Sequence, residues 1–267
     1  MSTPKIQCPV VPESLVNTSR TGCPASSIMR VWCGFYHASA GWRDWSTRGR
    51  DMGIPLGDVT RRPRQVPLMT ILIIAVNGFV FVLELMGGDP FVLRWSLVPA
   101  DVSAGRNLVT VLTSMFMHEG WMHILGNMVF FWAFGPQIED AMGQARYLIF
   151  YLLSGLAATV AQVALAPSST VPNLGASGAI AGVMGAFIVT YPRDEIRTLL
   201  ILGWFVRVTV IPASLLIGVW FLIQLFSQVG SIADVQSGGV AYAAHVGGFL
   251  FGALTGRLFE KSRQIDT

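Results

Sequence analysis

The chain has 267 residues, of which 52% are hydrophobic and only 12% are charged. Because charged residues make up about 25% of an ordinary soluble domain, this composition argues against a cytosolic enzyme or a nucleic-acid-binding protein and for an integral membrane protein. The net charge of +3 is uneven: residues 1–66 carry nine Lys or Arg against four Asp or Glu, whereas residues 67–267 carry nine against eleven. The basic excess therefore belongs to the N-terminal segment.

Residues 1–66 lack the continuous apolar core of a signal peptide, since Ser, Thr, Pro, Arg and Gly interrupt each hydrophobic run. We expect a mostly disordered, basic cytoplasmic tail here, with a small folded domain as the alternative. Three cysteines lie in it, Cys8, Cys23 and Cys33, at irregular spacing and without a CxxC pair. This pattern favours neither a disulfide framework nor a zinc site.

Six apolar stretches after residue 66 are candidates for membrane-spanning helices, and charged residues, prolines or glycines separate them. They cover about residues 67–86, 121–138, 145–166, 176–191, 206–228 and 240–258. We therefore predict an all-α polytopic membrane protein with a single bundle of six transmembrane helices over residues 67–259. A short cytoplasmic C-terminal tail, residues 260–267, follows it.

Basic residues indicate how the bundle is oriented. Six spans place both termini on one side of the membrane, and nine Lys or Arg fall on that side, whereas Arg94 and Arg106 fall on the other. The nine are Arg61, Arg62, Arg64, Arg146, Arg193, Arg197, Arg257, Lys261 and Arg263. The positive-inside rule predicts that both termini are cytoplasmic. The loops at 87–120, 167–175 and 229–239 then face outward.

Polar side chains inside a membrane span are expensive and usually functional, and four of those in the predicted spans stand out. His123 and Asn127 are four residues apart, so they share one face of the second span. Ser177 begins the fourth span and His245 lies in the sixth. By the predicted topology, His123, Ser177 and His245 lie toward the outward ends of their helices.

These residue types suit nucleophilic catalysis. A serine hydroxyl is a weak nucleophile until a base removes its proton, and neutral histidine can do so near pH 7. Asn127 and His123 can donate hydrogen bonds to a developing oxyanion. Because no carboxylate lies at matching depth in a neighbouring span, we expect a dyad of Ser177 and His245 rather than a triad with an acid.

Glycines accompany both members of the expected dyad. Gly175 and Gly178 flank Ser177, where they allow a tight turn and close backbone approach. Gly248 and Gly252 follow His245 on the same helix face. Because small faces let membrane helices pack closely, we expect the fourth and sixth spans to approach near enough for a direct Ser–His hydrogen bond.

The combined pattern resembles the rhomboid family of intramembrane serine proteases over about residues 60–260. Its GxSG motif matches residues 175–178, and its second-helix HxxxN motif matches residues 123–127, with His118 at the expected offset before it. Its sixth-helix histidine matches His245 and the glycines that follow it. Each motif alone is weak, but all three in order on spans two, four and six are highly specific.

The resemblance implies cleavage of single-pass transmembrane proteins near a membrane boundary, without cofactor or metal. It assigns Ser177 as nucleophile and His245 as general base, with the Ser177 backbone N–H, Asn127 and His123 at the oxyanion. Family members prefer small residues at the cleavage point. The partners we expect are such substrates and membrane lipid, with no nucleic acid; the oligomeric state is left open.

The chain departs from the family at two places. Val109-Thr110 stands where a Trp-Arg pair is frequent in the first outward loop, and Ala181 stands where many relatives stack an aromatic ring on the histidine. The ring of His245 must then be held in another way. The segment from Met52 resembles the start of a compact bacterial rhomboid, which favours a bacterial plasma membrane. Residues 1–51 are then an extension particular to this chain or precede the native start.

Three rival readings stay open from the residues. An inactive rhomboid-like protein would bind membrane clients, but such proteins usually lose the serine or the histidine, and this chain keeps both. A channel or transporter would need polar residues across the whole membrane depth, whereas here they cluster near one face. His118, His123 and His245 could form a zinc site, but a five-residue gap places the first two on different helix faces.

Overall fold

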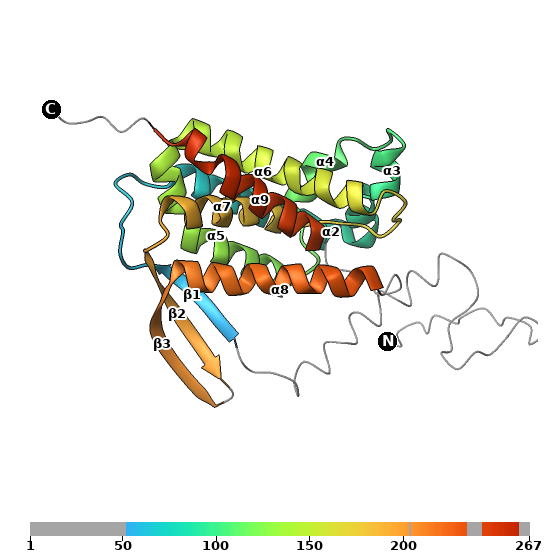
Figure 1. The fold of residues 1–267 in the computed structure, drawn as a ribbon. Helices are drawn as coiled ribbons and strands as arrows, with labels where there is room; N and C mark the ends of the chain where they lie inside the picture. The colour runs from blue at the N-terminus through green and yellow to red at the C-terminus, as the bar shows by residue number, and fades with distance from the viewer. Residues whose placement is uncertain (1–51, 203, 234–241, 262–267) are drawn as a thin grey trace, which may run out of the picture. The chain divides into compact units, whose positions relative to one another are not determined.

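The computed structural model describes residues 52–202, 204–233 and 242–261, and this part is mostly helical (Figure 1). The longer helices are α2 (Leu68–Trp95), α5 (Trp121–Met142), α6 (Gln144–Leu165), α7 (Ser177–Thr190), α8 (Ala213–Ala233) and α9 (Tyr242–Phe259). Short helices α3 (Pro99–Ser103), α4 (Thr110–Thr113) and η3 (Ser114–Phe116) connect α2 to α5. Each predicted span overlaps one of the longer helices. Two of them, α2 and α6, are long and apolar enough to cross a membrane, and α7 and residues 213–223 are shorter apolar helices.

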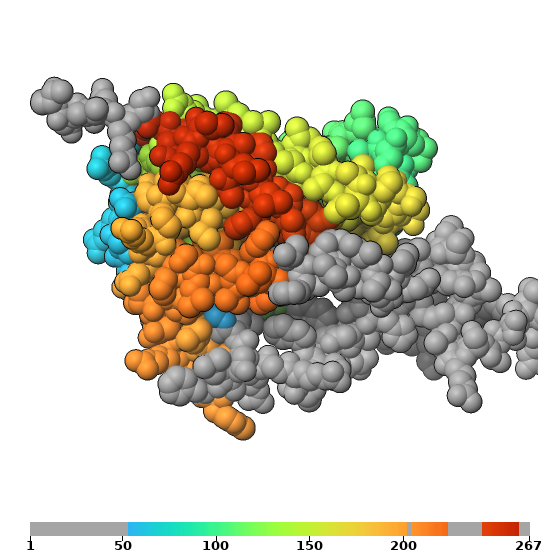
Figure 2. Space-filling view, in the orientation of Figure 1, coloured from blue at the N-terminus to red at the C-terminus, as the bar shows by residue number. Residues whose placement is uncertain are grey.

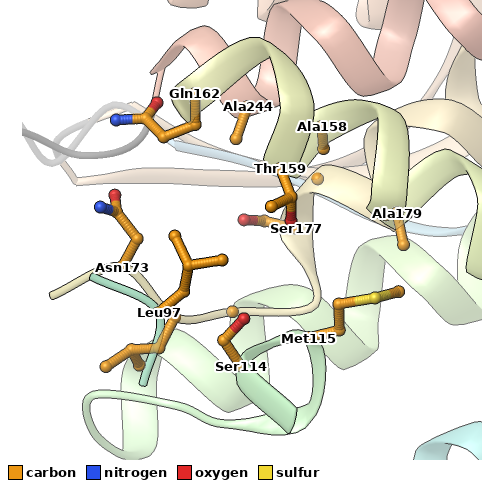
Figure 3. Close-up of a pocket in the computed structure, with 14 residues that line it drawn as sticks. Leu97, Ser114, Met115, Ala158, Thr159, Gln162, Asn173, Ser177, Ala179 and Ala244 are labelled. Atoms are coloured by element: carbon orange, nitrogen blue, oxygen red, sulfur yellow. The ribbon is translucent and has the colours of Figure 1, made fainter. Parts of the chain in front are cut away.

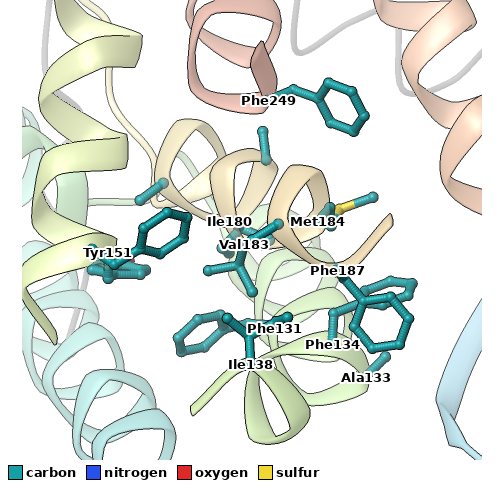
Figure 4. Packing of buried hydrophobic residues seen from close by; sticks show 14 of the residues in the cluster. Phe131, Ala133, Phe134, Ile138, Tyr151, Ile180, Val183, Met184, Phe187 and Phe249 are labelled. Atoms are coloured by element: carbon teal, nitrogen blue, oxygen red, sulfur yellow. The ribbon is translucent and has the colours of Figure 1, made fainter. Parts of the chain in front are cut away.

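Helix α7 lies at the centre of the bundle, packed on α5, α6 and α9. Its residues are small or apolar, and those from Gly178 to Phe187 are buried on every side. The aromatic rings of Phe134 and Phe187 meet edge to face, with centroids 5.1 Å apart (Figure 4). A helix that is apolar all round is stable only in the interior, so its neighbours fix the position of Ser177 at its first residue.

A three-stranded antiparallel sheet corrects the all-α prediction. Strands β1 (Met52–Asp58), β2 (Glu195–Leu202) and β3 (Phe205–Pro212) pair in the order β1-β2-β3. The predicted fifth span began at 206, but residues 205–212 form β3 and the helix begins at Ala213. The physical reason is the alternation of β-branched residues in the sequence VRVTVI, which suits a paired strand better than a helix.

Strand β1 also corrects, over residues 52–58, the prediction that residues 1–66 are mostly disordered. Residues 52–58 lie within the predicted tail, yet they pair with β2 along its whole length. Arg61 then donates a hydrogen bond to the carboxylate of Asp194 at 3.1 Å, just before β2 begins. The predicted tail is therefore structured from Met52 onward. The three cysteines, residues 1–51 and most of the predicted C-terminal tail lie outside the described residues.

Glu139 joins α5 to the first turn of α2. The side chain is buried, and its carboxylate accepts hydrogen bonds from the backbone N–H groups of Met69 and Thr70, both at 2.8 Å, and from the Thr70 hydroxyl at 2.8 Å. The N–H groups at the start of a helix have no partner within that helix, and a buried carboxylate satisfies two of them here.

Replacing Glu139 by glutamine is expected to destabilise the bundle by about 1–3 kcal/mol. The amide keeps one acceptor oxygen but turns an NH₂ group toward backbone donors, which leaves buried hydrogen-bonding groups unpaired. Thermal unfolding in detergent measures the change, with Glu195→Gln on the exposed surface as the control. Equal melting temperatures for the two variants would show that the Glu139 carboxylate contributes nothing to stability.

Candidate active site

Ser177 and His245 meet at one end of the bundle, opposite the end that carries the sheet. Ser177 is the first residue of α7, and His245 lies in the first turn of α9. The Ser177 Oγ and His245 Nε2 atoms are 2.6 Å apart, within hydrogen-bonding distance. His245 is buried, with 8% of its surface exposed. The structure therefore brings together the two residues that the sequence paired.

Close packing of α7 on α9 makes this contact possible. A Cβ atom added at Gly248 would overlap the carbonyl oxygen of Gly178, and one added at Gly252 would overlap the carbonyl oxygen of Gly182. The two backbones thus touch directly along the glycine face. This is the packing expected of small residues at a membrane helix interface.

The turn before Ser177 requires glycine. Gly175 has a φ of +136°, a conformation that other L-residues rarely adopt, and its N–H donates to the Ser114 carbonyl at 2.8 Å. A Cβ added at Gly175 would lie 3.1 Å from the imidazole of His123 and 3.4 Å from the Ser177 Oγ. The turn therefore packs the histidine of α5 beside the serine of α7.

The hydrogen bonds of His123 indicate which ring nitrogen can donate. Its Nδ1 atom accepts a hydrogen bond from the Glu119 backbone N–H at 3.3 Å. In a neutral imidazole the other nitrogen, Nε2, then carries the proton, and Nε2 lies, together with Cε1, beside the Gly175 turn. His123 can therefore donate a hydrogen bond into the space next to Ser177.

Two further donors are available to an anion at this place. Asn127 lies one turn after His123 on α5, and its Nδ2 atom is buried with no hydrogen-bond partner among the described residues. The backbone N–H of Ser177 belongs to the first turn of α7, where N–H groups lack partners within the helix and the helix dipole is positive. The arrangement can stabilise an oxyanion that forms on a carbonyl attacked by Ser177.

The buried carboxylates of Glu84 and Glu139 are engaged elsewhere. Glu84 of α2 accepts two hydrogen bonds from the His118 backbone N–H, at 3.0 and 3.1 Å, and Glu139 holds the start of α2. The His118 ring lies edge-on to His123, with centroids 5.2 Å apart. Burial lowers the pKa of His118 to about 3, and the repulsion that a protonated His123 would exert acts in the same direction. His118 is therefore neutral at physiological pH. In the part of the chain that the structure describes, no group of three His, Cys, Asp or Glu side chains is placed to hold a metal ion.

A small cavity of about 50 Å³ opens beside Ser177. Figure 3 shows the serine side chain directed into it, with α6 on one side and the segments around Leu97 and Asn173 on the other. Those two segments are joined by a pair of backbone hydrogen bonds at 2.7 and 2.9 Å. Residues from α6 form the far wall: Gly155, Ala158, Thr159 and Gln162. The cavity has room for a few atoms.

One contact of His245 could not be inferred from the sequence. The indole ring of Trp220, on α8, lies against the imidazole with ring centroids 5.7 Å apart and planes inclined by 47°. Ala181, where relatives often carry an aromatic residue, is fully buried in the α7 packing. An aromatic neighbour of His245 therefore comes from α8. No sequence motif identifies Trp220, because its contact with His245 depends on how α8 is rotated against α9.

Comparison with known proteins places the chain among rhomboid sequences. Residues 105–262 match the Rhomboid domain family. Rhomboid protein 1, mitochondrial, of Saccharomyces cerevisiae is 29% identical over 184 residues, which are 65% of this chain and 49% of that protein. Rhomboid protease GluP of Bacillus subtilis is 28% identical over 182 residues, 67% of this chain and 35% of that protein.

A third relative extends the match further along the chain. RHOMBOID-like protein 12, mitochondrial, of Arabidopsis thaliana is 29% identical over 239 residues, which are 84% of this chain and 63% of that protein. The chain thus spans between about a third and two thirds of the length of these curated relatives.

Proposed function

Because this chain belongs to the rhomboid family, we propose that it is an intramembrane serine endopeptidase that cleaves single-pass transmembrane proteins near the membrane boundary. The observation that carries the proposal is the 2.6 Å contact between Ser177 Oγ and His245 Nε2 at the end of two closely packed helices. In this proposal α2, α5, α6, α7, α8 and α9 cross the membrane. Ser177 lies near the outer face of a bacterial plasma membrane, and both termini are cytoplasmic.

The proposed reaction is acyl transfer through a covalent intermediate. His245 Nε2 takes the proton of Ser177, and Oγ attacks the carbonyl carbon of the scissile bond. His245 then gives its proton to the leaving amine, and a water molecule, deprotonated by the same nitrogen, hydrolyses the acyl-enzyme. Donors from Ser177 N–H, His123 and Asn127 stabilise the oxyanion, and each is typically worth about 10²–10³ in rate.

The cavity beside Ser177 sets the size of the residue that precedes the cleaved bond. At about 50 Å³ it accommodates a small side chain, whereas an aromatic ring would have to displace Leu97 or the α6 wall. We therefore assign it as the pocket for this side chain. A preference for small residues follows from the volume.

The direct test uses proteoliposomes that contain the protein and a tagged single-pass transmembrane substrate. A substrate with alanine at the cleavage point is expected to yield one fragment, whose new terminus identifies the cut, and a phenylalanine variant is expected to be cut far more slowly. A fragment that forms equally with Ser177→Ala would overturn the proposal. A substrate that co-purifies uncut with well-folded wild type, across small-residue variants, would favour the client-binding alternative.

Trp220 is proposed as a positioning residue for the general base. An imidazole that serves as base must keep its Nε2 atom aimed at Ser177, and the indole of α8 limits rotation of the ring from the side. The adjacent Phe221 has a different neighbour, since it stacks on Phe249 of α9 with centroids 4.2 Å apart. Variants at the two positions therefore distinguish loss of the contact with His245 from loss of general packing between α8 and α9.

Trp220→Ala is expected to lower kcat by about 10-fold to 100-fold with little change in KM, because misplacement of a catalytic group slows the chemical step. Trp220→Phe is expected to restore most of the rate, since it keeps a ring beside the imidazole. Phe221→Ala serves as the matched control and should lower the melting temperature with less effect on kcat. If both alanine variants lose kcat equally, Trp220 acts through packing alone.

A further inference from the structure

The hairpin of β2 and β3 has one face on which the valine side chains of β3 are exposed among the residues that the structure describes. In an antiparallel pair, residues opposite one another point to the same side, so Ile201 and Val206 share a face, as do Leu199 and Val208. With Val210 they form an apolar surface that we call the valine face. The three valines are 61%, 54% and 47% exposed, in chain order.

The opposite face of the same sheet is the one that packs on the helices. Ile196 and Thr198 of β2 are fully buried, and Ile196 belongs to the hydrophobic core of the bundle. Arg207, on this opposite face near the hairpin end, is exposed. The hairpin therefore places Arg207 on one side and its three exposed valines, with Arg197 at the base, on the other. The helix bundle uses only the side without the valines.

The strand that carries the valine face leads directly into a helix with an exposed apolar side, which faces lipid if α8 spans the membrane. β3 ends at Pro212 and α8 begins at Ala213, with no intervening loop. Leu215, Val219 and Leu222 of α8 are 57%, 48% and 50% exposed and lie along one side of that helix. Exposed apolar side chains thus lie on both sides of the junction between β3 and α8.

In the proposed six-span topology, on which this inference rests, the hairpin lies at the level of the membrane boundary. It begins where α7 ends and finishes where α8 starts, so its base is at the ends of these two helices. Figure 1 shows it running out sideways from this end of the bundle, at an angle to α8 rather than along its axis. An element that leaves a transmembrane bundle sideways at the helix ends lies in the interfacial layer of the bilayer.

The residues around the valine face suit an interface between lipid headgroups and acyl chains. Trp204, next to the start of β3, is 93% exposed, and tryptophan is enriched at this depth of membranes. Arg197 lies on the same face as Val210, at the base of the hairpin, and Arg193 precedes it. Cations here attract the phosphate groups of anionic lipids.

We propose that the β2–β3 hairpin is an interfacial membrane anchor, with its valine face in the headgroup–acyl boundary of the leaflet opposite the Ser177 end. The occupant of this face is lipid, because the exposed apolar side chains of α8 follow the valine face directly in the chain and because Trp204 and Arg197 border it. The anchor is separate from proteolysis, and it constrains the connection between α7, which carries Ser177, and α8, which carries Trp220.

Paired spin labels on neighbouring residues test the proposal. Cys8, Cys23 and Cys33 are replaced by serine, and the full-length chain then receives either Val208→Cys or Arg207→Cys with a nitroxide label. Both side chains are exposed but lie on opposite faces of β3. Each labelled protein is reconstituted in vesicles of phosphatidylcholine and phosphatidylglycerol. Collision rates with oxygen, which concentrates in lipid, and with a water-soluble nickel chelate are then measured.

The oxygen-to-nickel ratio is expected to be several times higher at position 208 than at position 207. Equal, water-like ratios at both positions would overturn the anchor, because the hairpin would then stand in solvent. A label at 208 that is shielded from both reagents would also overturn it, since a second copy or residues 1–51 would then cover the face. The collision rates do not depend on catalysis, so the anchor can be tested whether or not the protein is an active protease.

Discussion

Replacing Ser177 by alanine is expected to reduce cleavage of a single-pass substrate by at least about 10⁴-fold, because loss of a nucleophile removes the covalent route entirely. His245→Ala is expected to cost about as much, since the serine hydroxyl then has no base at 2.6 Å to take its proton. The double variant should be no slower than either single variant. When two residues act as a unit, removal of either one already abolishes their joint contribution to the rate. Initial rates of fragment release in proteoliposomes measure all three.

Folding of these variants is checked by thermal unfolding, with Ser214→Ala as the control, a serine that is exposed near the start of α8. The control is expected to keep the wild-type rate and melting temperature. If the losses of the two single variants multiply in the double variant, Ser177 and His245 act independently. That result would remove the dyad from the mechanism.

Gly252→Ala is expected to have the second largest effect. The added methyl group would overlap the Gly182 carbonyl oxygen, so α7 and α9 would have to move apart. Displacement of a catalytic group by about 1 Å can cost about 100-fold in rate, and we expect a loss of this size. Overpacking of this kind also destabilises a protein by about 1–3 kcal/mol.

Gly218→Ala is the matched control for the helix interface. Gly218 lies in α8, and an added Cβ there would meet no atom within 4 Å. Alanine favours a helix more than glycine does, so this variant should be as stable as wild type or slightly more stable. The assays are cleavage rate and melting temperature. Equal activity of the two glycine variants would show that close approach of α7 and α9 is not needed for cleavage.

The helical part of the fold could be predicted because its signal is local. Each predicted span overlaps a helix, and α2 and α6 meet the length and hydropathy of a membrane-spanning helix. The sheet was missed because VRVTVI was joined to the apolar stretch of α8, and a hydropathy window does not separate a strand from the helix that follows it. The strand partner is also remote, since residues 52–58 pair with a segment more than 130 residues later.

The candidate site could be predicted where short motifs carry it. Gly175 is required by its positive φ, and Gly248 by the backbone of α7 against it, so sequence and geometry agree at these positions. Trp220 could not be found in this way. Its contact with His245 depends on the rotation of α8 and α9 about their axes, and no short sequence pattern predicts that rotation.

Covalent labelling tests the central proposal most directly. Wild-type protein in proteoliposomes is treated with a serine-directed fluorophosphonate, and the adduct is located by mass spectrometry of peptides. We expect a single adduct on Ser177, formed far more slowly in His245→Ala because the imidazole activates the hydroxyl. A folded wild-type protein that remains unlabelled, or an adduct on a different residue, would contradict the assignment of Ser177 as an activated nucleophile.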